Sequence, residues 1–74
     1  MDIRVVFARN LRARRLACGL SQEALADAAG LDRTYISALE RGVYSASLDM
    51  LGKLATVLGV EPAEMLKRPT RTSR

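Results

Sequence analysis

The sequence contains no histidine and no tryptophan, and it has one cysteine among its 74 residues. Histidine is the side chain that most often serves as a general base or as a zinc ligand. One cysteine, Cys18, cannot form a disulfide or a cysteine-based zinc site within a single chain. The sequence also shows no glycine-rich phosphate loop and no evident pair of catalytic carboxylates. We therefore expect no catalytic site, metal site or cofactor, and no small-molecule substrate.

Aromatic residues and long apolar runs are scarce as well. Only Phe7, Tyr35 and Tyr44 are aromatic, although 49% of the residues are hydrophobic, so the core must consist mainly of Leu, Ala, Val and Ile. That composition favours packed helices over a sheet, within one small domain. No segment approaches the length of a secretory signal or a membrane span, and Cys18 fits a reducing compartment. We expect a cytoplasmic protein in which Cys18 is a small, partly buried residue packed near a helix end rather than a redox sensor.

Charge is unevenly distributed along the chain, whose net charge is +4. Residues 1–20 carry five arginines and one aspartate, and residues 67–74 carry four basic residues and no acid. The intervening residues 21–66 carry seven acids and three basic residues. This balance is compatible with a polyanionic partner but does not require one. Because residues 67–74 have no apolar pattern, we expect a disordered basic tail after a domain of residues 1–66.

Capping residues divide the chain into five predicted helices. Serine and aspartate are good N-caps, glycine suits the left-handed residue that ends many helices, and proline suits a first helical position. These rules predict helices over residues 3–18, 22–29, 33–41, 48–58 and 62–66. Apolar residues at helical spacing predict that the second and fourth helices pack inward through Leu20, Leu25, Ala28 and Ala29, and through Leu48, Leu51, Leu54, Ala55 and Leu58.

The third predicted helix, residues 33–41, has two different sides. With about 100° of rotation per residue, the polar side chains fall on one arc, and the larger apolar side chains Tyr35, Ile36 and Leu39 fall opposite. Any amphipathic surface helix has such a solvated polar arc. The helix nevertheless follows the second one after a very short turn that contains Gly30, and this arrangement is typical of a helix-turn-helix.

Four fragments of the chain resemble the Cro and phage-repressor (XRE) family of helix-turn-helix DNA-binding proteins. These fragments lie at residues 20–26, 29–37, 39–42 and 47–60, in the order and at the separations found in that family. The run from Leu31 to Ser37 looks most like the controller proteins of restriction-modification systems. The resemblance implies an all-α, five-helix, lambda-repressor-like domain whose third helix lies in the major groove of DNA.

Carried over by position, the resemblance implies roles for particular residues. The base-contacting positions are Arg33, Thr34, Ser37 and Ala38. Their chemistry agrees, because Arg can bond guanine, hydroxyls can serve several bases, and a methyl group can contact thymine. The phosphate-contacting positions are Gln22, at the N-terminus of a helix, and more weakly Tyr35, Arg41, Ser45 and Ser47. The resemblance further implies a structural salt bridge between Arg15 and Glu40.

The sequence thus predicts a transcriptional regulator that binds a two-fold related operator in double-stranded DNA as a homodimer. Apolar residues near the last helix are the expected dimer interface, unless they only complete the core of the monomer. These residues are Leu58, Val60, Met65 and Leu66. The alternative is a protein-interaction module of the same fold, such as an antitoxin or antirepressor subunit.

Overall fold

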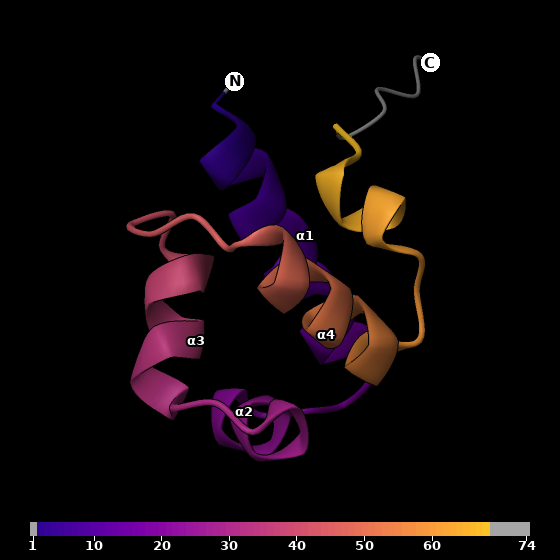
Figure 1. The fold of residues 1–74 in the computed structure, drawn as a ribbon. Helices are drawn as coiled ribbons and strands as arrows, with labels where there is room; N and C mark the ends of the chain where they lie inside the picture. The colour runs from indigo at the N-terminus through magenta and orange to yellow at the C-terminus, as the bar shows by residue number, and fades with distance from the viewer. Residues whose placement is uncertain (1, 69–74) are drawn as a thin grey trace.

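The computed structural model describes residues 2–68 and is all-helical over that range (Figure 1). Four α-helices are followed by one 3₁₀-helix. Their bounds are α1 Ile3–Ala17, α2 Gln22–Ala29, α3 Arg33–Glu40, α4 Leu48–Leu58 and η1 Pro62–Leu66. The all-α prediction is confirmed, and so is the number of helical segments. The fifth segment, however, is a short 3₁₀-helix rather than an α-helix.

Side-chain caps begin the helices where the sequence predicted them. Ser21 Oγ accepts a hydrogen bond from Ala24 N at 3.0 Å, and Asp32 Oδ1 accepts one from Thr34 N at 2.9 Å. The hydroxyl of Ser47 caps α4 in the same way. Gly30 follows α2 with a φ of +68°, a left-handed conformation that costs glycine nothing. These local bonds satisfy backbone groups that helix ends otherwise leave unpaired.

The third helix lies between two neighbours, because α3 packs against α2 on one side and against α1 on the other. The fourth helix packs against α2 and η1, and η1 returns to α1. Figure 1 shows α1 running behind α4, with α3 at the left of the view and α2 at the bottom. The largest side chains that are completely buried come from every element, so one core joins the whole domain. They are Val6, Leu11, Leu25, Ile36, Leu39, Leu54 and Met65.

Four details of the predicted helices were wrong. Leu48 does not belong to the core stripe of α4: it is 84% exposed, because it is the first residue of the helix and the stripe begins one turn later, at Leu51. In α2 Ala29 is buried as predicted, but the second buried alanine is Ala26, and Ala28 is exposed. The first and third helices each end one residue earlier than predicted, at Ala17 and Glu40, and Cys18 and Arg41 are their C-caps. Cys18, expected to be packed, is exposed at the end of α1.

The C-terminal segment is held against α1 by polar contacts. Asn10 Nδ2 donates to Met65 O at 2.9 Å and to Lys67 O at 2.8 Å, so both of its amide protons are used. On the surface, Arg14 Nη2 lies 3.4 Å from Glu64 Oε1. The predicted basic tail falls, from residue 69 onward, outside the described residues. None of the helices over residues 2–68 has the length and apolar character that crossing a membrane requires.

Candidate nucleic-acid interface

Helices α2 and α3 form a helix-turn-helix. Only three residues, 30–32, separate them, and they pack directly against each other. Gly30 provides the left-handed turn, and Asp32 starts the second helix through its side-chain cap. The hydrogen bond from Thr34 N lowers the pKa of the Asp32 carboxyl, because it favours the charged form. Short-range chemistry thus ends α2 and begins α3.

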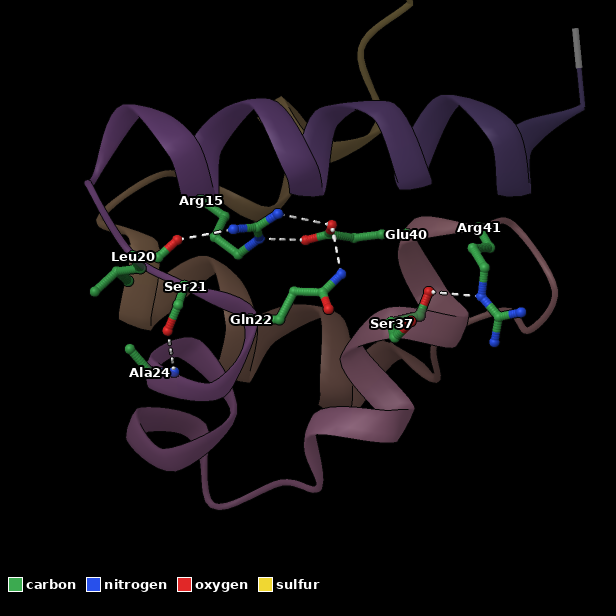
Figure 2. Close-up of polar contacts among 8 residues, drawn as sticks. All are labelled: Arg15, Leu20, Ser21, Gln22, Ala24, Ser37, Glu40 and Arg41. Atoms are coloured by element: carbon green, nitrogen blue, oxygen red, sulfur yellow. Dashed lines mark hydrogen bonds and ion pairs between the residues drawn. The ribbon is translucent and has the colours of Figure 1, made fainter.

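A polar arc of α3 faces away from the core. Arg33, Thr34 and Arg41 are exposed, and Ser37 is half-buried between them. Among residues 2–68, the side chain of Arg33 makes no hydrogen bond or ion pair, so its guanidinium remains available for a ligand. Arg41 bends back along the helix, with its Nε donating to Ser37 O at 3.4 Å (Figure 2). This arc carries the predicted hydroxyl and guanidinium groups on one surface.

The structure does not place Ala38 on that surface. Ala38 is 3% exposed and belongs to the buried side of α3, with Ile36 and Leu39. The helical wheel put its methyl at the border of the polar arc, and contact with both α1 and α2 widens the buried side past that border. A side chain with so little free surface has no methyl to offer a thymine, so we leave Ala38 out of the proposed base-contacting set.

The positions predicted to contact phosphate lie on the two helices and in the segment that follows them. Gln22 is the first residue of α2 and is half-buried, as is Tyr35 on α3. Ser45 and Ser47 are exposed in the segment between α3 and α4. Ser47 already accepts a hydrogen bond from Met50 N, but its hydroxyl proton can still be donated to an anion.

One carboxylate joins three helices behind this surface (Figure 2). Arg15 of α1 donates to Glu40 of α3 twice, from Nε to Oε2 at 2.6 Å and from Nη2 to Oε1 at 3.0 Å. Gln22 Nε2 of α2 donates to the same Oε1 at 3.1 Å. The side chains of the pair are only 8% and 3% exposed, and the bonds to Glu40 raise the pKa of Arg15 above its ordinary value. The predicted salt bridge between Arg15 and Glu40 is therefore present in the structure.

The sequence did not predict the contact of Gln22 with Glu40. These residues lie 18 positions apart and on different helices, so no helical spacing rule relates them. The role that the sequence predicted for Gln22 was a phosphate contact. In the structure its amide also completes the hydrogen bonding of a buried carboxylate.

The predicted dimer residues divide into two groups. Met65 is fully buried and Leu58 is 6% exposed, so these two complete the core of the monomer and are not available to a partner. Val60 is half-buried and Leu66 is 38% exposed. Leu66 also lines a small apolar depression of about 90 Å³, together with Ile3 and Phe7. A dimer interface in this region would have to use Val60 and Leu66.

Residues 11–65 match a known family model described as Helix-turn-helix, HTH_3. The chain belongs to the HTH_3 helix-turn-helix family. The match covers α2, α3 and α4 entirely, together with the C-terminal part of α1 and most of η1. The predicted resemblance to the XRE-type regulators is thereby confirmed.

Relatives of this HTH_3 domain have names that refer to regulation. A hypothetical transcription factor of Neisseria meningitidis is 46% identical over 68 residues, which are 92% of this chain and 64% of that protein. The chain thus spans just under two thirds of the length of this relative. Control protein C.BamHI of Bacillus amyloliquefaciens is 44% identical over 66 residues, covering 88% of this chain and 82% of its own.

Solved structures agree with this assignment. The crystal structure of the Neisseria factor superposes with a TM-score of 0.89 at 46% identity, over 92% of this chain and 78% of that one. The restriction-modification controller protein C.AhdI from Aeromonas hydrophila superposes with a TM-score of 0.80 at 50% identity, over 84% of this chain and 94% of that one. Both the fold and the similarity to controller proteins were therefore predicted correctly.

Proposed function

We propose that this HTH_3 domain is a sequence-specific DNA-binding transcriptional regulator that acts in the cytoplasm and has no enzymatic activity. The observation that carries the proposal is the polar arc of α3, with Arg33 and Thr34 exposed and Arg33 uncommitted. In this role α3 enters the major groove, and Arg33, Thr34 and Ser37 contact base edges. An arginine guanidinium can donate two hydrogen bonds to guanine, at O6 and N7, and this is the commonest base-specific contact in the major groove.

Residues on and near α3 position this helix on DNA by contacting phosphates. Gln22 lies at the N-terminus of α2, where the helix dipole favours an anion. Arg41, Tyr35, Ser45 and Ser47 are further phosphate contacts of this proposal. Contacts of this kind fix register on the duplex and carry no sequence information themselves.

The regulator binds a two-fold related operator as a homodimer. One recognition helix specifies few base pairs, and two of them on half-sites about one helical turn apart supply the remaining specificity. Val60 and Leu66 form the centre of the proposed contact. The similarity to C.BamHI and C.AhdI supports a restriction-modification controller as the biological role. Adjacent genes for an endonuclease and a methyltransferase would support that role, and a prophage or conjugative element would favour another switch.

The test is selection of bound sequences from a pool of random duplexes, followed by titration at several salt concentrations. The expected result is enrichment of one two-fold related sequence, whose affinity falls steeply with salt because bound protein releases counterions. Failure to enrich any sequence would contradict the proposal. Salt-insensitive association with another protein, without binding to duplexes, would support the alternative of an antitoxin or antirepressor subunit.

A further inference from the structure

The side-chain amide of Gln22 already makes a hydrogen bond within the protein, without any ligand. Its Nε2 donates to Glu40 Oε1 at 3.1 Å, and within residues 2–68 it makes no other hydrogen bond. The acceptor is a carboxylate oxygen that also accepts from Arg15 Nη2 at 3.0 Å. A carboxylate of this kind only accepts hydrogen bonds, so it selects the orientation in which the amide nitrogen, and not the amide oxygen, faces it.

A primary amide nitrogen carries two protons. The contact with Glu40 uses one of them and leaves the other available at the half-buried N-terminus of α2. A phosphate diester offers only acceptors, so an amide that turned its oxygen toward DNA would be repelled. Gln side chains have much rotamer freedom, and one that is fixed in the free protein loses less entropy on binding.

We infer that Glu40 is a positioning residue for DNA binding, which holds the Gln22 amide with one N–H directed at itself and the other free for a phosphate. The inference rests on the proposed function. It makes the phosphate contact of α2 depend on the buried pair between α1 and α3. Glu40 therefore acts on DNA through Gln22 and touches no part of the duplex.

The first test is a double-mutant cycle on affinity for a random-sequence duplex at low salt. Removing Glu40 alone would leave a buried arginine unpaired, so the pair is replaced as a unit in R15M/E40L, since apolar replacement of a buried pair is often tolerated. Losing one positioned hydrogen bond should weaken binding about three- to ten-fold when Gln22 is present. In the Q22A background the same replacement should cost less than about two-fold, because the contact it supports is already gone.

The control variant R14M and the unmodified protein separate the possible failures. R14M removes an exposed arginine whose partner Glu64 is 36% exposed, so its effect on affinity should be equal with and without Gln22. An equal loss for R15M/E40L in both backgrounds would show a merely structural pair and overturn the inference, while the proposed function stands. Absence of duplex binding by the unmodified protein would overturn both.

A second measurement uses the unmodified protein, so it does not depend on the folding of any variant. Gln22 is the only glutamine of the chain and Asn10 the only asparagine, so the NMR spectrum contains just two side-chain carboxamide NH₂ pairs. The Gln22 pair should be ordered in the free protein, as measured by the ¹⁵N relaxation of its side-chain amide, and added random-sequence duplex should shift chiefly one of its two protons. A Gln22 amide that is mobile in the free protein, or unperturbed by saturating duplex, would overturn the inference.

Discussion

Arg15 and Glu40 meet across 25 residues of sequence, with Arg15 Nε 2.6 Å from Glu40 Oε2. Arg15 also donates from Nη1 to Leu20 O at 2.8 Å, so the same guanidinium holds the segment that leads into α2. The pair therefore ties the first helix to both helices of the helix-turn-helix. Because α3 has only eight residues, tertiary contacts of this kind must set its position.

Removing either partner of this pair should strongly destabilise the domain. Arg15→Ala or Glu40→Ala leaves a buried charge without its partner, and such losses cost about 3–5 kcal/mol. The double variant should cost less than the sum of the two single variants, as measured by urea denaturation. Arg14→Ala is the matched control: its pair with Glu64 is 44% and 36% exposed, so it should cost at most about 1 kcal/mol. Additive losses for Arg15 and Glu40 would contradict the coupling.

The exposed guanidinium of Arg33 should determine specificity at one base pair. Arg33→Ala is expected to weaken binding to the selected operator by about 1–3 kcal/mol and to relax discrimination at that position, because one bidentate contact is lost. Gln22→Ala should instead weaken all sequences more evenly. Competition titrations against a set of single-base operator variants measure both effects. Equal losses for Arg33→Ala on operator and random DNA would remove Arg33 from the base-contacting residues.

Helix boundaries were predictable because the interactions that set them are local. The hydroxyl of Ser21 binds an amide three residues ahead, and the carboxylate of Asp32 binds one two residues ahead. Such bonds depend on adjacent sequence alone, and the structure confirms both caps. The family resemblance was available for the same reason, since the fragments that carry it lie close together in the chain.

Errors arose where a third element decides the outcome. Ala38 is buried at the border of the polar arc on α3, a helix that packs against both α1 and α2, whereas Leu48 is 84% exposed although helical spacing places it on the apolar stripe of α4. A helical wheel describes one helix in isolation, so it could show neither the burial of Ala38 nor the exposure of Leu48. The Gln22–Glu40 contact joins two helices through a buried carboxylate, and no periodicity in the sequence relates the two residues.

Asn10 should contribute to stability through its two bonds to the backbone of the C-terminal segment. Asn10→Asp replaces two donors by acceptors that face Met65 O and Lys67 O, at positions where the amide nitrogen lies 2.9 and 2.8 Å away. The unpaired groups should cost about 1–3 kcal/mol at neutral pH, measured by thermal or urea unfolding. Glu64→Gln, which removes only exposed ion pairs in the same region, should cost no more than about 1 kcal/mol. Equal effects of the two variants would contradict this role of Asn10.

The helix caps should make the domain sensitive to acid. Hydrogen bonds from the backbone N–H groups of Arg4 and Thr34 lower the pKa of Asp2 and of Asp32 below the ordinary aspartate value of 3.8. A lowered pKa in the folded state adds stability that is complete above the unfolded-state pKa and is lost as the pH falls through the folded-state value. The midpoint of urea unfolding should therefore fall with pH below about 4. D2N/D32N keeps both caps without titration and should show a weaker pH dependence; an unchanged dependence would contradict the assignment.

Leu66 should be needed for dimerisation but not for folding. It is 38% exposed beside an apolar depression, so Leu66→Lys removes an intermolecular contact while leaving the core residue Met65 in place. Sedimentation should show a monomer with a nearly unchanged melting temperature. Affinity for the two-fold operator should fall by about a hundredfold or more, because the two half-sites no longer bind as one ligand. Leu16→Lys is the matched control, since Leu16 is an exposed leucine of α1, and this variant should remain dimeric. A dimeric Leu66→Lys variant, or a monomeric unmodified protein that still binds the two-fold site tightly, would contradict the proposed interface.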